Sequence, residues 1–528
     1  MRRLILRAKI NYFARITAGE SPAEKYAASE LSKYLEKAGI PAGEEGADIR
    51  ILIDPGLPRD GYRIDIPKQG DRYIRIRGGN GRGVIYGVYG FLTHYAGMRF
   101  FQPGLESLGE GDVDVQEGIE FTPVFDMRRL DGHFGNDDPD WCVKNGVNAR
   151  EIPPEMGGYY YYADGRFCHT MEYLTGVPQS AQPCLSDPEV LKTTIAKVRE
   201  MLARNPDCSA VSVTQNDNLD YCTCPKCAAA DAEEESHAGS LIRFVNAVAD
   251  DIAADYPNVV VDTFAYTYSR KPPKKTKPRD NVSVMICSYE CCFSHPLSDM
   301  SCPKNVDFCR DLVAWSKICR KIRVWDYVAN YGFYVPTYAN FRVMQENMRF
   351  FAEHNVIGVY PEGAYNTPAS GEFGELRSYL LAKLLADPAM GLGEYYRHMD
   401  EFLAAFYGAG WRYIRAYIDW FIGEAGRHHA DLAAKPLSFI TEDRYAAMEE
   451  TFVSWWDKAE EAAQDETVRE RVRRSRMQLR CIQLMLHPDA GRAEEFVEDM
   501  KRWNIRWREK HLLPEKQHLA LSPENWSW

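Results

Sequence analysis

Apolar and polar positions follow two alternating periods over the first 120 residues. From Ser21 to Gly39 the apolar residues recur at helical spacing, with Ser21 as an N-cap and Gly39 as a stop signal. The stretch "RYIRIRG" (72–78) alternates apolar and polar residues, which indicates a half-buried strand. We therefore predict an N-terminal α/β domain over residues 1–120.

Between residues 121 and 390, short apolar runs end in polar or aromatic residues and are separated by helical patterns. Eight strand–helix units are typical of a (β/α)8 TIM barrel, in which the carboxyl ends of the strands carry the chemistry. The first three runs are the least regular, because residues 131–182 are rich in loops and their helical patterns are weak. The eight predicted strands are "VFDMRRLDG", "GVNARE", "GRFCHTM", "AVSVTQND", "VVVDTFAYTYS", "VSVMICSYECC", "IRVWDYVANY" and "VIGVYPEGAY".

After residue 390 only helical patterns remain, such as "EYYRHMDEFLAAFYG" (394–408) and "VRERVRRSRMQLRCIQLML" (468–486). We expect a C-terminal α-helical domain over residues 391–528. The predicted fold class is therefore α/β, with a central barrel over 121–390 between an N-terminal α/β domain and a helical one.

Composition and charge argue against some classes of binding partner. The chain has 45% hydrophobic and 27% charged residues, as in an ordinary globular protein. Its formal net charge of -12 argues against a nucleic-acid partner, because binding phosphates needs clustered Lys and Arg. No run reaches the ~18 apolar residues of a membrane-spanning helix, so no membrane partner is expected. The N-terminus lacks the apolar core of a secretory signal, which predicts a cytoplasmic location unless the natural chain begins earlier. A homodimer is left open as a possible assembly.

Acidic and polar residues follow the later strands of the predicted barrel. Neighbouring carboxylates in one cavity have pKa values that are pushed apart, which lets one act as an acid while another stays ionised, and glycoside cleavage needs such a pair. An isolated acidic residue at a strand end is also common as a helix cap or an ion-pair partner. The residues at these strand ends are Asn216 and Asp217, Tyr266, Glu290, Asp326 and Tyr327, and Glu362. We take Asp217, Glu290 and Glu362 as the catalytic candidates.

Substrate-binding candidates come from the same positions. Aromatic rings give sugar rings a stacking surface, and Trp325, Tyr266 and Tyr327 would supply it. Asn216 and Asp326 add polar contacts, and His169 at the end of the third predicted strand would bind a hydroxyl group. Core packing is the alternative for Trp325, and a structural role is the alternative for His169. The expected partner is a carbohydrate substrate.

Three cysteines, Cys222, Cys224 and Cys227, lie within six residues. Thiols that hold a loop, with or without a disulfide, are the first interpretation, and no cofactor or catalytic metal is expected. Structural zinc is the alternative, but it needs a fourth ligand. The candidates for that ligand are Cys291, Cys292, Cys302 and His295.

Long stretches of the chain resemble a known family. The matching stretches are "VSVTQNDNLDYCTCPKC", "GSLIRFVNAVADDIAADYPNVVVDTFAYTYSRKPP", "CSYECCFSHPLSD", "VWDYVANY" and "GELRSYLLAKLLADP". They resemble the domain of unknown function 4838, part of which is classed as glycoside hydrolase family 163. The segment "RGVIYGVYGFLTHYAGMRFFQPG" (82–104) is similar to the small domain that precedes the barrel in family 20 hexosaminidases and family 67 α-glucuronidases.

This resemblance implies a retaining β-N-acetylglucosaminidase that acts on glycans containing N-acetylglucosamine. In such enzymes the 2-acetamido oxygen of the substrate attacks the anomeric carbon and forms an oxazoline, so the protein supplies no nucleophile. The family pattern places an orienting residue beside an acid at the fourth strand, which corresponds here to Asn216 and Asp217. Glu290 and Glu362 are the alternative acids.

Three other functions are left open. An α-glucuronidase-like or other exo-glycosidase would use a basic residue such as Arg128, Arg129 or Arg150 to bind a sugar carboxylate. A catalytically inactive carbohydrate-binding protein would keep the fold without the chemistry. A hydrolase that depends on zinc bound by the cysteines would lose activity with a chelator.

Overall fold

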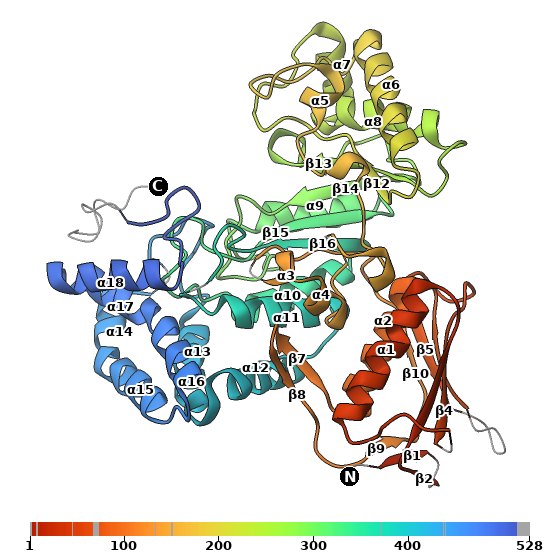
Figure 1. The fold of residues 1–528 in the computed structure, drawn as a ribbon. Helices are drawn as coiled ribbons and strands as arrows, with labels where there is room; N and C mark the ends of the chain where they lie inside the picture. The colour runs from red at the N-terminus through yellow and green to blue at the C-terminus, as the bar shows by residue number, and fades with distance from the viewer. Residues whose placement is uncertain are drawn as a thin grey trace.

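The computed structural model describes residues 3–6, 9–44, 46–66, 73–132, 134–148, 151–369, 371–436, 438 and 440–514. Figure 1 shows a red N-terminal region of sheets and helices on one side of a central parallel sheet. A blue C-terminal region of helices lies on the other side. Helices α5 to α8 (residues 171–252) lie at the top, next to strands β12 and β13 at one edge of the central sheet. The chain is thus a mixed α/β protein with a helical C-terminal region.

The N-terminal region is built around a five-stranded sheet in the order β10-β5-β6-β4-β3, covered by helices α1 and α2. A second sheet has the order β2-β1-β9, and β7 pairs with β8. The strands of this region are β1 (Leu4–Leu6), β2 (Lys9–Asn11), β3 (Ala14–Ala18), β4 (Ala47–Ile53), β5 (Tyr62–Asp65), β6 (Tyr73–Gly78), β7 (Arg99–Gln102), β8 (Leu105–Ser107), β9 (Val113–Val115) and β10 (Ile119–Phe121), and its helices are α1 (Pro22–Lys37) and α2 (Gly81–His94).

The start of α1 shows how local sequence produces this region. Ser21 caps the helix, and its hydroxyl accepts a hydrogen bond from the backbone N–H of Glu24 at 3.2 Å. The Glu24 carboxylate accepts from the backbone N–H groups of Ser21 and, at 2.7 Å, of Ile53 in β4. One carboxylate therefore completes the cap and ties the helix to the sheet.

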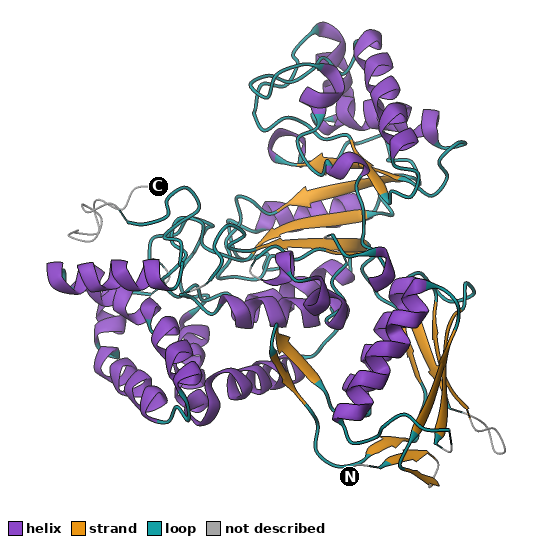
Figure 2. Cartoon of the chain, viewed as in Figure 1, coloured by secondary structure: helices purple, strands orange, loops and turns teal. Residues whose placement is uncertain are grey.

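The central sheet is parallel throughout and has the order β11-β16-β15-β14-β13-β12 (Figure 2). Its strands are β11 (Met127–Arg128), β12 (Ala210–Ser212), β13 (Val260–Ala265), β14 (Val282–Cys287), β15 (Ile322–Tyr327) and β16 (Val356–Glu362). The helices between them are α3 (Phe134–Asp137), α4 (Pro139–Lys144), α5 (Met171–Thr175), α6 (Pro188–Arg204), α7 (Pro225–Glu234), α8 (Ala238–Ile252), α9 (Val306–Ser316) and α10 (Phe341–Ala352), and α11 (Gly374–Ala386) follows β16.

A closed barrel of eight regular strands is not confirmed, because the second and third predicted strands are irregular in the described residues. Between β11 and β12, the chain around Asn148 and Tyr160–Tyr162 is linked to the sheet by single backbone hydrogen bonds. The N–H of Asn148 donates to the carbonyl of Arg128 at 3.1 Å, and the N–H of Tyr160 donates to the carbonyl of Asn148. On the other side, the N–H of Ser209 donates to the carbonyl of Tyr161 at 2.7 Å.

Buried side chains, rather than strand pairing, hold this irregular segment against the sheet. Arg323 of β15 is fully buried, lies 3.5 Å from Asp262 of β13 and donates to the hydroxyl of Tyr160. The hydroxyl of Tyr162 donates to Asp262 at 2.8 Å. A buried charge must be paired and hydrogen-bonded, so Tyr160 and Tyr162 are held next to Arg323 and Asp262, whose remaining polar atoms they bind.

Only helices follow β16 as regular elements in the described residues. Their packing extends the hydrophobic core of the sheet, since Phe373 stacks on Trp456 and packs edge-on against Tyr417. After α11, these helices are α12 (Leu392–Tyr407), α13 (Trp411–Glu424), α14 (Glu442–Ala446), α15 (Glu449–Glu461), α16 (Glu466–Ser475), α17 (Met477–Leu486) and α18 (Ala490–Arg502). No helix in the described parts of the chain is long and apolar enough to cross a membrane.

Candidate functional site

A cavity of about 460 Å³ lies at the carboxyl ends of the central strands. Residues that are far apart in the sequence meet there, because parallel strands bring their ends to one edge. The lining residues are His169, Asp217, Phe264, Tyr266, Cys287, Tyr289, Trp325, Tyr327, Tyr331, Glu362, Leu432, Glu509 and Lys510. Six of the nine residues predicted as catalytic or substrate-binding are among them.

The two-residue period of a strand decides which predicted residues reach this cavity. Trp325 and Tyr327 of β15 line it, and Asp326 between them points to the other face of the sheet. Asp326 is buried there and accepts a hydrogen bond from the Ser288 hydroxyl at 2.7 Å. Burial raises the pKa of Asp326 to about 6. The expectation that Asp326 faces the substrate is therefore wrong.

Glu362 at the end of β16 is the carboxyl group with the strongest chemical signal in the cavity. Its Oε2 accepts a hydrogen bond from the indole Nε1 of Trp325 at 2.7 Å. Burial raises the pKa of Glu362 to about 7, and the negative charges of Asp131 and Glu509 add to this effect. A carboxyl group with such a pKa can donate a proton near neutral pH.

Asp217 is exposed to the same cavity. Its Oδ1 accepts a hydrogen bond from the Tyr266 hydroxyl at 3.2 Å, and its backbone N–H donates to Oε1 of Gln179 at 3.4 Å. Burial, followed by the charge of Asp217, raises the pKa of Tyr266 above its usual value, so this hydroxyl remains a donor. At the strand ends and the loop after β12, the cavity therefore holds the half-buried Glu362 and the exposed Asp217, and Glu509 adds a third carboxyl group from the helical region.

Asn216 is fully buried and holds a loop instead of facing the cavity. Its side-chain amide donates to the carbonyls of Val177, Pro178 and Ala181, the last at 2.8 Å. Its Oδ1 accepts from the backbone N–H of Glu172 at 3.0 Å. The predicted role of Asn216 as a substrate-orienting residue is therefore corrected, because its polar atoms already have protein partners.

Glu290 also lies outside the cavity. Its carboxylate pairs with Arg270, whose Nε donates to Asp311 at 2.7 Å. The Glu290 side chain is 45% exposed, and the residue that lines the cavity at this strand end is Tyr289. The expectation that Glu290 lines the same cavity as Asp217 and Glu362 is wrong, because the chain turns after β14.

His169 reaches the cavity from a loop, not from a strand end. It adopts a left-handed backbone conformation with φ of 49°, and its Nδ1 donates to the carbonyl of Gln215 at 2.8 Å. Because a carbonyl oxygen can only accept, Nδ1 carries the hydrogen of this bond.

Several lining residues have no counterpart in the sequence-based prediction. The two-residue period could have identified Tyr289, which follows Cys287 by two positions. Leu432 comes from the loop after α13, and Glu509 and Lys510 come from the turn after α18. No pattern in the sequence links these helical-region residues to the strand ends.

The arginines considered for a sugar carboxylate occupy other positions. Arg128 is buried and binds Asp60 at 3.0 Å. Arg129 lies over the ring of Phe167, 4.2 Å from its centroid, and is not among the residues that line the cavity. Arg150 falls outside the described residues.

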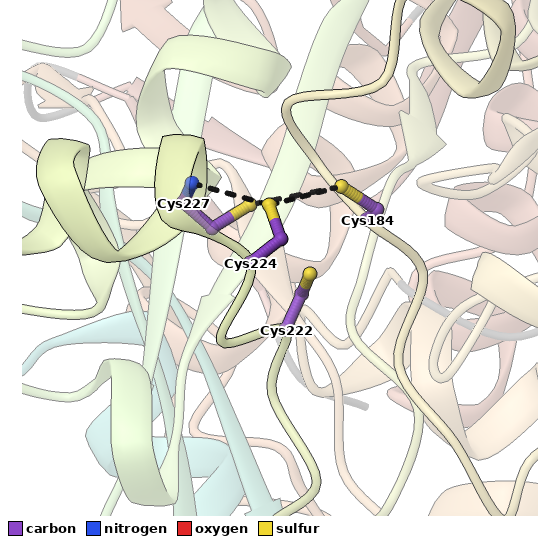
Figure 3. A group of neighbouring side chains, drawn as sticks. All are labelled: Cys184, Cys222, Cys224 and Cys227. Carbon is purple, nitrogen blue, oxygen red and sulfur yellow. Dashed lines mark hydrogen bonds between the residues drawn. The ribbon is translucent and has the colours of Figure 1, made fainter.

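The predicted cysteine cluster has a different fourth member. Cys184, from the loop before α6, joins Cys222, Cys224 and Cys227, and the four sulfur atoms lie within 4.8 Å of one another (Figure 3). The four residues considered above as the fourth ligand belong elsewhere. Cys292, His295 and Cys302 form a second group with His429, and Cys291 is buried outside both groups.

Residues 150–419 match the family model described as "Domain of unknown function (DUF4838)", and the chain belongs to this family. No curated protein matches the chain in sequence.

Solved structures of glycoside hydrolases share low similarity with this chain. A family 138 enzyme targeting pectin rhamnogalacturonan II has 11% identity and a TM-score of 0.47, covering 93% of this chain and 72% of its own. A family 89 glycoside hydrolase from Clostridium perfringens in complex with PUGNAc has 10% identity and a TM-score of 0.47, with 91% and 65% covered. A family 20 exo-β-N-acetylglucosaminidase from Vibrio harveyi in complex with N-acetylglucosamine has 9% identity and a TM-score of 0.41, with 78% and 74% covered.

Proposed function

We propose that this protein is a glycoside hydrolase whose active site is the cavity containing Asp217 and Glu362. The observation that carries the proposal is the presence of these two carboxyl groups, in different environments, within one cavity walled by Tyr266, Trp325 and Tyr327. Paired carboxyl groups perform glycoside cleavage, and aromatic rings bind the apolar faces of sugars.

Glu362 is the proposed general acid. The raised pKa of about 7 keeps a proton on this group below neutral pH, and the Trp325 indole holds its orientation. The proton moves to the glycosidic oxygen as the bond from that oxygen to the anomeric carbon breaks. The Glu362 carboxylate then takes a proton from the water molecule that completes hydrolysis.

The finer proposal is a retaining β-N-acetylglucosaminidase that uses the 2-acetamido group of its substrate. Asp217, held by the Tyr266 hydroxyl, would accept the acetamide N–H, and the acetamide oxygen would attack the anomeric carbon to form the oxazoline. This assignment differs from the sequence-based one, since the Asn216 amide has protein partners and Asp217 takes the orienting role. In the same proposal the sheet is an irregular (β/α)8 barrel, in which Asn148 and Tyr160–Tyr162 replace two strands.

A uronide is the alternative substrate within the same chemistry. The observation that favours it is Lys510, a basic residue among those that line the cavity, which could bind a sugar carboxylate. The two substrate classes differ at carbons 2 and 6 of the sugar, so one set of substrates distinguishes them.

The test is a panel of aryl glycosides that differ only in a 2-hydroxyl or 2-acetamido group and in a 6-hydroxyl or 6-carboxylate group. Hydrolysis of the 2-acetamido sugars, with inhibition by a thiazoline mimic of the oxazoline, supports the finer proposal. In that case Asp217→Asn lowers kcat on these substrates by about 10²-fold or more, because the acetamide loses its charged acceptor. Hydrolysis of uronides supports the alternative. Glycan binding without hydrolysis of any substrate contradicts the proposed enzymatic function.

A further inference from the structure

Two groups of cysteine and histidine side chains lie outside the cavity, and each joins segments that are far apart in the sequence. The first group is Cys184, Cys222, Cys224 and Cys227, called here the four-cysteine cluster. The second is Cys292, His295, Cys302 and His429, called here the cysteine–histidine cluster. In both groups all four ligand atoms lie within 4.8 Å of one another.

The sulfur separations in the four-cysteine cluster match a metal tetrahedron. Sγ of Cys184 lies 3.7 Å from Sγ of Cys224 and 3.9 Å from Sγ of Cys227. Thiolates ~2.3 Å from a zinc ion define a tetrahedron with edges of roughly 3.8 Å, whereas a disulfide needs a sulfur–sulfur distance of about 2.05 Å. Figure 3 shows the side chains of the four cysteines gathered around one point from two separate segments.

The surroundings of this cluster favour thiolates. Cys224 is the N-cap of α7, and its sulfur accepts the backbone N–H of Cys227 at 3.5 Å. The start of a helix stabilises negative charge through its free N–H groups. The hydroxyl of Ser186 lies 3.1 Å from the sulfur of Cys227, where it can donate a further hydrogen bond.

We propose that the four-cysteine cluster binds a structural zinc ion. Four thiolates complete the coordination of zinc and leave no position for water, so the site is structural rather than catalytic. The ion would fasten the loop that contains Cys184 to the loop that follows β12. Gln179 and Gln182 of the first loop hydrogen-bond the backbone of Asp217 and Asn216, so this ion also secures the position of the proposed orienting residue.

Independent contacts support a second zinc ion in the cysteine–histidine cluster. Nδ1 of His295 lies 3.2 Å from Sγ of Cys292, and Nδ1 of His429 lies 3.7 Å from Sγ of Cys302. A zinc tetrahedron with nitrogen at ~2.0 Å and sulfur at ~2.3 Å has edges of roughly 3.5 Å between these atoms.

We infer that this second ion joins the central sheet to the helical C-terminal region. Three of its ligands lie in the segment after β14, and His429 lies in the loop after α13. The backbone of the two segments is already paired there, since the N–H of Phe293 donates to the carbonyl of Ala430 at 2.7 Å. The same loop contributes Leu432 to the wall of the cavity.

The experiment measures zinc per chain by plasma mass spectrometry in full-length protein purified without chelators or metal-affinity resin. Two zinc ions per chain are expected for the wild type, one for each cluster. Cys184→Ser should lose one ion, and Cys208→Ser, which alters a buried thiol outside both clusters, should lose none. His429→Ala should lose one ion, and His428→Ala at the adjacent exposed residue should lose none.

A measurement on the wild type covers the case in which a variant does not fold. Replacement of zinc by Co²⁺ should produce the intense visible absorption of tetrahedral cobalt with thiolate ligands. Metal-free wild-type protein with a Cys184 disulfide in non-reducing peptide mass spectrometry overturns the first assignment. Unchanged zinc in soluble Cys184→Ser overturns the first assignment, and unchanged zinc in soluble His429→Ala overturns the second. Since all these readouts are independent of hydrolysis, they separate failure of the zinc assignments from failure of the proposed activity.

Discussion

The two sides of the cavity are built by different means. On one side, β13–β16 are regular strands of six or seven residues, and their alternation positions Tyr266, Trp325, Tyr327 and Glu362. On the other side, His169 and Asp217 lie on loops that side-chain amides hold in place. The first side depends on a repeating backbone ladder, and the second depends on individual polar contacts.

This difference indicates where each side is vulnerable. A ladder of backbone hydrogen bonds tolerates changes in side chains, because the bonds do not involve them. A loop held by buried amides loses its conformation when one amide is removed, because the carbonyls it served are left without partners. Substitutions on the regular side should therefore change chemistry, and substitutions on the irregular side should change stability and geometry together.

The largest effect is expected for Glu362→Gln on the regular side. Loss of the proton donor should lower kcat by about 10²- to 10⁴-fold on substrates with poor leaving groups. The loss should be much smaller for activated aryl leaving groups, which need no protonation. Steady-state kinetics with a leaving-group series checks this prediction, and an equal loss across the series would contradict the assignment of Glu362 as the acid.

On the irregular side, Asn216→Ala should destabilise the protein by about 2–4 kcal/mol, because the change leaves several buried backbone groups unpaired. Denaturant unfolding measures the difference. Asn281→Ala is the matched control, since this half-buried amide donates to one carbonyl, that of Ala249, and its loss should be about 1 kcal/mol. A loss no larger for Asn216→Ala than for the control would show that Asn216 does not hold the loop.

The pH dependence of stability tests the environment of Glu362. The folded state raises its pKa from 4.5 to about 7, so the folded protein binds this proton more tightly than the unfolded chain does. The wild type should therefore lose stability between about pH 4.5 and pH 7 relative to Glu362→Gln. With ~1.36 kcal/mol per pH unit, the difference reaches roughly 3.4 kcal/mol and is constant above that range.

Unfolding free energies measured from pH 4 to pH 8 check this expectation. Glu353→Gln, at an exposed position after α10 where the carboxylate pairs with Arg349, is the control, and its difference from the wild type should vary much less across the range. A difference between Glu362→Gln and the wild type that does not vary with pH would show that the Glu362 pKa is not raised.

The smallest effect is expected for Glu290→Gln. The Glu290 side chain is 45% exposed, and Arg270 keeps its bond to Asp311, so the loss of stability should stay within about 1 kcal/mol. Activity should stay within about twofold of the wild type, because Glu290 does not line the cavity. A loss of activity comparable to that of Glu362→Gln would instead return Glu290 to the catalytic group.

Much of the regular side was predictable from the sequence. The apolar composition of the runs that form β13–β16 predicts them as strands. Polar residues directly after such runs must lie at one edge of a parallel sheet. Glu362, Trp325 and Tyr327 follow from that rule. The rule failed for Asp326 because a strand shows only every second residue to one face, and a continuous apolar run does not reveal which residues those are.

The irregular side and the metal-binding candidates depended on tertiary structure. The segment Tyr160–Tyr162 is held by Arg323 and Asp262, which lie 100 or more residues away in the chain, and no local pattern contains that contact. The pairing of Cys184 with the cysteines of 222–227, and of His429 with Cys302, likewise depends on which loops meet in space.

The sequence alone determined the secondary-structure periods, the regular strands and the residues at their ends, because these properties depend on neighbours within a few positions. Tertiary structure decided which of the carboxyl groups share a cavity, which side-chain amides are hydrogen-bonded to loop carbonyls and which thiols form a group of four. Those outcomes depend on side chains that approach from distant segments, and their burial, charge and hydrogen bonds exist only after the chain has folded.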